Sequence, residues 1–208
     1  MAYATITELR TALNKTDNTD DAVLVRLLDA ASQNIDRFCN RPDGFVADTT
    51  ASARLYKGSG TGWQRIDECV EVSTVKTKAS ATSSYDTWTS SDYIECSGDE
   101  RFPNYNPIVE GKPYTALRVD PNGDYSIFYT DGTYPTVEVT ARWGYASQVP
   151  YSIKEASVMQ AVRWYKRLKS GMSDTLASAD VGLLMYTRTL DPDIKRLLVD
   201  GRFVRPPL

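Results

Sequence analysis

Residues 20–39 read DDAVLVRLLDAASQNIDRFC, and this stretch decides the class of fold. Its apolar side chains recur every three or four residues, which is the period of an amphipathic helix with one buried stripe. Thr19 or Asp20 can cap the start of this helix. Residues 40–44 (NRPDG) end it, because proline and glycine do not continue a helix. The stripe consists of Leu24, Leu28, Ala31, Ile35 and Phe38.

Helices are also expected on both sides of this one. Residues 5–8 (TITE) and 152–155 (SIKE) each have the sequence of a capping box, in which a hydroxyl and a carboxylate satisfy backbone amides at a helix start. The first opens a short helix, and the second opens a longer helix with apolar residues at helical spacing. Asp191 as N-cap, Pro192 in the first turn and Gly201 as the stop mark a short last helix.

The middle of the chain has a different period. Between Phe45 and Trp143, short runs rich in valine, threonine and tyrosine alternate apolar and polar residues, as antiparallel strands do. The clearest strand is 137–143, with its four apolar side chains on one face. The alternation slips between Val72 and Val75, which indicates a bulge. Further strands are expected around residues 54–57, 64–67, 70–77 and 92–96.

Two connecting segments are also interpreted from their turn residues. Residues 115–119 and 125–129 flank a turn that contains Asn122-Gly123, and this arrangement predicts a hairpin. Residues 170–180 are small and polar, which predicts a flexible linker or loop.

The fold class that follows is α+β. We expect a helical core made of two N-terminal and two C-terminal helices, with an antiparallel β-rich region inserted between them. The expected divisions are the N-terminal core helices at 1–44, the β-rich insert at 45–145, the C-terminal core helices at 146–200 and an extended tail at 201–208.

The residue inventory argues against catalysis. The chain has no histidine, which excludes Ser-His-Asp and Cys-His triads and histidine-containing zinc sites. Its three cysteines are far apart and form no C-x-x-C pair. Ser73 and Lys76 have the spacing of a serine-lysine acylating pair, but they lie in strand-like sequence without its companion motifs. We therefore predict no enzyme, no catalytic residue, no cofactor and no metal site.

Positive charge gathers near the end of the chain. Residues 151–208 hold ten Lys and Arg against six Asp and Glu, a balance of +4 within a net charge of -3. Four of these cations surround Trp164 and Tyr165, a composition typical of nucleic-acid contacts. On a helix they spread over more than one face, which favours a solvated or subunit-facing surface and leaves non-specific DNA contact open. The four are Arg163, Lys166, Arg167 and Lys169.

The tail at 201–208 is a candidate for partner binding. Its prolines prevent a helix, and a short segment of this kind cannot bury its apolar side chains cheaply unless it orders on a partner. No apolar run in the chain is long enough to span a bilayer, and residues 1–10 lack the apolar core of a signal peptide. We therefore expect no membrane partner. The candidate residues of the tail are Arg202, Phe203, Val204, Arg205 and Leu208.

Seven segments, in this order and at similar spacing, resemble the head-to-tail connector (adaptor) proteins of tailed phages. They cover both ends of the chain and only a few short parts of the middle. Shorter members of that family join their second and third helices by a brief β segment, so the role of the longer insert here does not carry over. The segments are 3–9; 20–24 continuing to 28–32 and 35–41; 56–60; 72–75; 143–145; 149–150 with 153–156; and 191–198.

The resemblance implies a non-enzymatic ring subunit in the virion neck, made in the host cytoplasm. In adaptors the ring typically has twelve copies, binds the portal protein, meets a stopper or tail-side protein and lines the channel through which genomic DNA passes. The same resemblance makes the portal or a neighbouring subunit the expected partner of the tail. The alternatives are another virion accessory, such as a stopper or tail-completion protein, and a small DNA-binding accessory protein.

Overall fold

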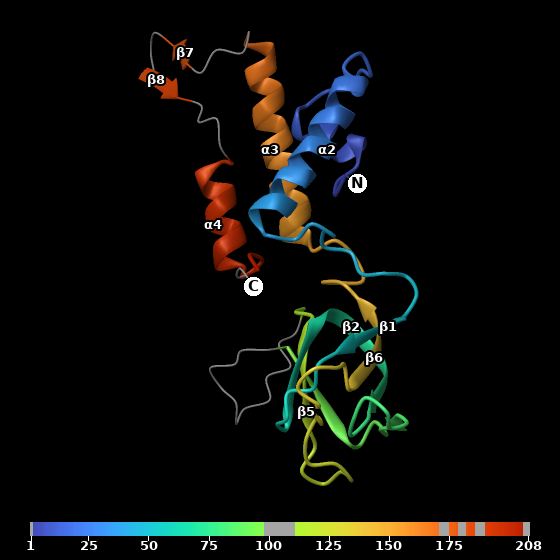
Figure 1. Ribbon diagram of the computed structural model, residues 1–208. Coiled ribbons are helices and arrows are strands. Elements are labelled where there is room, and N and C mark those ends of the chain that lie inside the picture. Colours follow the sequence, from blue (N-terminus) through green and yellow to red (C-terminus); the bar gives the residue numbers. More distant parts are fainter. Residues whose placement is uncertain (1, 98–110, 171–174, 179–181, 186–189, 206–208) are drawn as a thin grey trace. The chain divides into compact units, whose positions relative to one another are not determined.

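Two compact units make up the chain. The computed structural model describes residues 2–97, 111–170, 175–178, 182–185 and 190–205 (Figure 1). One unit joins Met1–Gly44 with Val149–Leu208, and the other is Phe45–Gln148. We refer to them as the helical unit and the β unit. With helices at both ends of the chain and an antiparallel sheet between them, the predicted α+β class is confirmed.

The helical unit contains the four expected helices, and α3 contacts each of the other three. The predicted stripe of α2 is buried from Leu24 to Ile35, and Phe38 is half-buried. Each large apolar side chain buried in this way contributes roughly 1.5–3 kcal/mol to folding. No helix among the described residues is long and apolar enough to cross a membrane. The helices are α1 (Ile6–Ala12), α2 (Asp21–Phe38), α3 (Tyr151–Lys169) and α4 (Pro192–Asp200).

One of the two predicted capping boxes is present. The Thr5 hydroxyl accepts from the Glu8 amide, and the Glu8 carboxylate accepts from the Thr5 amide. The box at residues 152–155 is wrong. Because α3 begins at Tyr151, with Pro150 as N-cap and no side-chain cap bond, Ser152 lies inside the first turn and cannot act as the cap.

The β unit is an antiparallel sheet of order β1-β6-β2-β5-β4, with β3 paired to β2. The long strand β2 holds it together, because its first half pairs with β5 and its second half with β6. The register of β2 against β6 shifts between Val72 and Thr74, at the predicted bulge. The strands are β1 (Ser52–Tyr56), β2 (Trp63–Thr77), β3 (Asp86–Thr87), β4 (Tyr93–Cys96), β5 (Tyr114–Val119) and β6 (Val137–Trp143).

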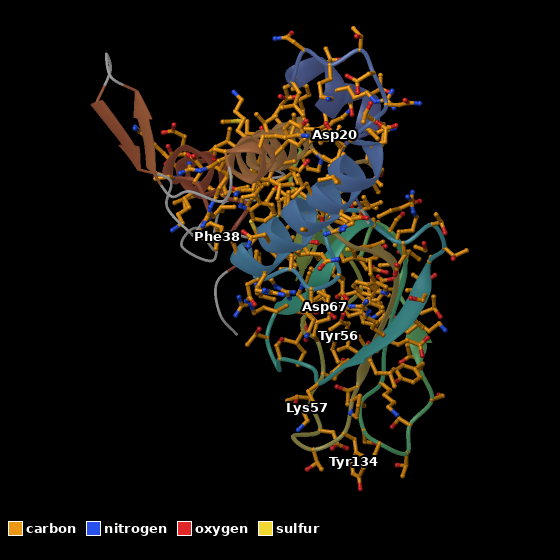
Figure 2. The ribbon with its side chains drawn as sticks, turned by 90° about the horizontal axis from the view of Figure 1, so that it is seen from above. Asp20, Phe38, Tyr56, Lys57, Asp67 and Tyr134 are labelled. Carbon is orange, nitrogen blue, oxygen red and sulfur yellow. The ribbon has the colours of Figure 1, made fainter. Side chains whose placement is uncertain are left out.

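Side chains connect β1 to the first half of β2. The Tyr56 hydroxyl donates to Asp67 at 3.0 Å, and both residues are labelled in Figure 2. Arg54 pairs with the same carboxylate at 2.8 Å. Strand β6 lies between β1 and β2 in the sheet, and the four apolar side chains of its predicted face are all buried. The core is therefore built around β6 and β2.

Two expectations for connecting segments are wrong. Residues 125–129 do not form a strand, because Tyr125 and Phe128 both stack on Trp88, at ring centroid distances of 4.3 and 4.7 Å. The loop expected at 170–180 contains a strand, β7 (Thr175–Ser178), which pairs antiparallel with β8 (Gly182–Met185).

Gly58 provides a test of the packing in the β unit. A Cβ at this position would lie 1.6 Å from the carbonyl oxygen of Tyr129, whereas a Cβ at Gly62 would meet nothing closer than 3.5 Å. We expect Gly58→Ala to lower the free energy of unfolding by about 2–3 kcal/mol through overpacking. We expect the control Gly62→Ala to change it little. Urea unfolding followed by tryptophan fluorescence measures both, and equal midpoints for the two variants would contradict this close approach.

Candidate interaction site

The tail packs on its own subunit as far as Arg205. Phe203 is only 8% exposed, its carbonyl accepts from Arg41 at 2.8 Å, and the Arg205 amide donates to the Cys39 carbonyl at 2.9 Å. Gly201 makes this fold-back possible, because a Cβ there would lie 2.4 Å from the Phe203 ring.

The expected tail with unburied apolar residues is therefore wrong for Phe203, whose ring lies in the helical unit. The sequence reasoning missed the turn at Gly201 and Arg202, where Arg202 has a φ of 52°. Arg202 is exposed, whereas Val204 and Arg205 are partly exposed. Leu208 lies outside the described residues.

The four cations predicted on α3 are not gathered into one surface. Arg163 forms an ion pair with Asp191, the N-cap of α4, and Lys169 forms one with Asp20 at 3.1 Å. Arg167 is partly buried, and Lys166 is exposed. Two of the four cations therefore hold helices together, because each is paired with the start of another helix.

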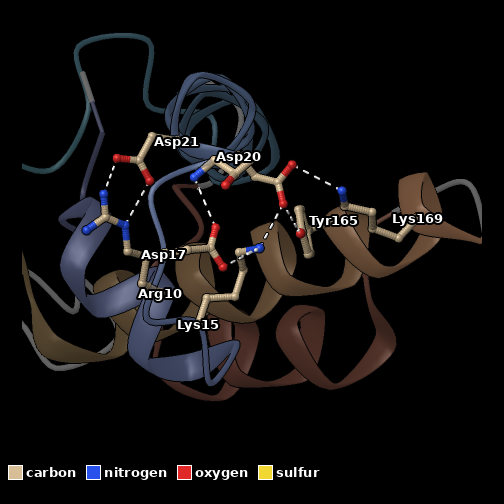
Figure 3. Close-up of polar contacts among 8 residues, drawn as sticks. Arg10, Lys15, Asp17, Asp20, Asp21, Tyr165 and Lys169 are labelled. Carbon is tan, nitrogen blue, oxygen red and sulfur yellow. Dashed lines mark hydrogen bonds and ion pairs between the residues drawn. The ribbon is translucent and has the colours of Figure 1, made fainter.

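Asp20 is the centre of a polar cluster that the sequence reasoning assigned only to capping. Its side chain makes no cap bond. It accepts instead from Lys15 at 2.8 Å, from the Tyr165 hydroxyl at 2.5 Å and from Lys169 at 3.1 Å (Figure 3). These contacts, led by Lys15, hold the pKa of the Asp20 carboxyl well below its usual range.

Two further ion pairs brace the same helices. Arg10 on α1 donates to Asp21 at the start of α2 at 2.8 Å. Glu8 on α1 pairs with Lys154 on α3, and this pair and the capping bonds lower the pKa of the Glu8 carboxyl to about 2. The start of α2 and both ends of α3 are thus fixed by charge as well as by apolar packing.

The β unit has a shallow groove of about 630 Å³. Among the described residues, no group of three or more Cys, Asp or Glu side chains could hold a metal ion. The groove is lined by Thr61, Gly62, Trp63, Arg118, Val119, Pro121, Tyr125 and Ser126.

Comparisons with known proteins gave one family match and several solved structures of similar fold. Residues 3–95 match the phage gp6-like head-tail connector protein family. A chain of the neck of an empty GTA particle, computed with C6 symmetry, has a TM-score of 0.50 at 13% identity, covering 99% of this chain and 91% of that chain. A chain of the neck of a native GTA particle, computed with C12 symmetry, has a TM-score of 0.49 at 12% identity, with the same coverage. The comparison with curated proteins gave no match.

Phe203 provides a test of the packed tail. We expect Phe203→Ala to lower the free energy of unfolding of the helical unit by about 3 kcal/mol, because it removes a buried aromatic ring. Val204→Ala, at a partly exposed neighbour, is the matched control. Urea unfolding followed by circular dichroism at 222 nm measures both. Equal stability of Phe203→Ala and the parent would mean that the tail does not pack as described.

Asp20 provides a test by pH. A carboxyl whose pKa is lowered in the folded state stabilises the fold above its unfolded pKa of about 4, and this stabilisation is lost as the pH falls through the folded pKa. We expect Asp20→Asn to lower Tm at pH 7. The difference in Tm between this variant and the parent should narrow between about pH 4 and 2. Asp29→Asn is the control, since Asp29 has no hydrogen bond or ion pair within the described part of the chain. A gap that stays constant with pH would show that the Asp20 charge is not responsible.

Proposed function

We propose that this chain is a head-tail connector protein, because residues 3–95 match the phage gp6-like head-tail connector protein family. It is a structural subunit of the virion neck that forms a ring between the portal and the tail-side proteins. The family match carries this proposal, because it spans α1, α2 and the strands as far as β4. The connector's work is assembly, and no catalytic step is part of it.

In this proposal the ring has twelve copies of the chain and surrounds the path of the genomic DNA. The helical unit carries nearly equal numbers of positive and negative side chains. This near-neutral charge favours passage of DNA through the ring over tight DNA binding, because strong DNA binding depends on many unpaired cations. Lys166 is the member of the α3 run with an exposed side chain and no ion pair in the described structure. Contact with DNA is therefore weak and non-specific.

The segment after α4 contacts the portal or the neighbouring subunit. Phe203 anchors this segment on its own subunit, which leaves Arg202, Val204, Arg205 and Leu208 as the candidate contacts. Arg202 is the exposed cation among the described members of this set. A segment anchored at one residue loses less conformational entropy on binding than a free tail, which favours affinity.

The central test mixes the purified full chain with its cognate portal. We expect the two proteins to co-sediment and to give a ring in electron micrographs, since an adaptor binds the portal directly. A chain that needs another neck protein first would be a stopper. A chain that binds no neck protein, but binds duplex DNA with an affinity that falls steeply with salt, would be a DNA-binding accessory.

Arg202 provides a test of the contact segment. We expect Arg202→Glu to weaken co-sedimentation with the portal about tenfold, by reversing a charge at the contact, and to leave Tm unchanged. Arg196→Glu, at an 82% exposed side chain on α4, is the matched control and should sediment like the parent. If both variants bind the portal equally well, the segment after α4 is not the portal contact.

A further inference from the structure

Three loops of the β unit meet at one end of its sheet. The strand ends that carry them lie side by side, because Tyr56 at the end of β1 and Thr77 at the end of β2 both pair with Val137 at the start of β6. The chain enters and leaves the β unit near the opposite ends of β1 and β6. We call these three loops the tip loops, and they are residues 57–62, 78–85 and 129–136.

Hydrogen bonds between the tip loops hold them in one arrangement. The Thr136 hydroxyl donates to the Tyr129 carbonyl at 2.5 Å and accepts from the Gly58 amide at 3.1 Å. The Asp131 carboxylate accepts from the Ala81 amide at 2.9 Å, so it joins the second loop to the third. Loops that are fixed in this way lose less conformational entropy on binding than free loops do, which favours affinity for a partner.

The side chains that the tip loops expose are typical of a protein-binding surface. Tyr134 is 58% exposed and Tyr129 is 37% exposed. Figure 2 shows Lys57 and Tyr134 at the same end of the β unit. The other exposed side chains of the tip loops are Ala79 and several serines and threonines. Tyrosine offers a large contact area at low entropic cost, and small hydroxyl side chains adapt their hydrogen bonds to the partner, a combination that antibody loops use.

The tip loops differ in charge from the rest of the β unit. Residues 45–148 hold nine Lys and Arg against fourteen Asp and Glu. The one acidic residue of the tip loops is Asp131, whose carboxylate already accepts from backbone amides. Lys57 is exposed and has no ion pair among the described residues. The tip loops therefore fit a partner that supplies carboxylates and carbonyl oxygens to the Lys57 ammonium and the tyrosine hydroxyls.

We propose that the tip loops are the docking surface for the tail-side protein of the neck, which binds them with an acidic patch on its folded surface. This inference rests on the proposed function, and it names the surface for one of the partners that the proposed function gives to the ring. The segment after α4 serves the portal or the neighbouring subunit, so the tail-side protein needs a different surface.

Substitutions in the tip loops test the docking surface in the full chain assembled on the portal. The probe is the cognate tail-side protein, which is added to the assembled rings and measured by co-sedimentation. We expect Tyr134→Ala and Lys57→Glu each to weaken its binding about tenfold, because the first removes an aromatic anchor and the second reverses a charge at the contact. Tyr151→Ala is the matched control, since Tyr151 is 75% exposed but lies on α3 in the helical unit. All three variants should melt and bind the portal like the parent.

A bulky group attached to the tip loops tests the same surface without removing an aromatic ring or a charge. The three native cysteines are buried, so an added surface cysteine can be labelled selectively. We expect Thr133→Cys labelled with a polyethylene glycol maleimide to lose binding of the tail-side protein. Thr49→Cys with the same label is the control and should bind like the parent, because Thr49 is exposed just before β1, at the end of this strand away from the tip loops.

The outcomes separate the two claims. If the Tyr134, Lys57 and labelled Thr133 variants form rings on the portal and bind the tail-side protein as the parent does, the docking surface is wrong and the proposed portal contact stands. Parent rings that bind the portal but not the tail-side protein would also overturn this docking surface. Absence of co-sedimentation of the parent chain with the portal would overturn the proposed function itself, and this inference with it.

Discussion

The packing of α2 on α3 is the contact on which the rest of the structure depends. It joins segments from the two ends of the chain, since Asp20 and Tyr165 are 145 positions apart. Apolar stripes supply most of the stabilisation, and the Asp20 cluster fixes how the ends of the two helices meet. Helix α3 contacts α1, α2 and α4, so it lies at the centre of the helical unit.

The β unit does not depend on this contact for its own core. Strand β2 pairs with both halves of the sheet, and Trp88 with Phe128 and Tyr125 fills the space beside them. An inserted unit with its own core can vary in length without disturbing the helices on either side. This explains how a long insert can interrupt a helical core whose four helices keep the order expected from the sequence.

Much of the fold followed from periodicity and capping. The stripe of α2, the alternation of β6 and the stop at Gly201 are local patterns, and they predicted elements that the structure contains. The errors came from interactions that local patterns do not carry. Tyr125 and Phe128 left the predicted hairpin because Trp88, far from them in sequence, provides a better partner.

The candidate site was harder to predict for the same reason. Composition identified Arg163 and Lys169 as cations near aromatic rings, but it could not show that each is paired with an aspartate from another helix. Phe203 was missed because its burial depends on a turn at Gly201 and on Arg41, which lies at the other end of the chain. The function was predicted instead from the order of seven segments that resemble the connector family. No single one of these segments specifies that function alone.

The most direct measurement of the central claim is a cryo-electron microscopy reconstruction of the neck of the native particle. We expect copies of this chain to form a closed ring directly below the portal, related by rotation about the channel axis. Density that places the chain elsewhere in the particle, or that shows no ring of it below the portal, would contradict the account.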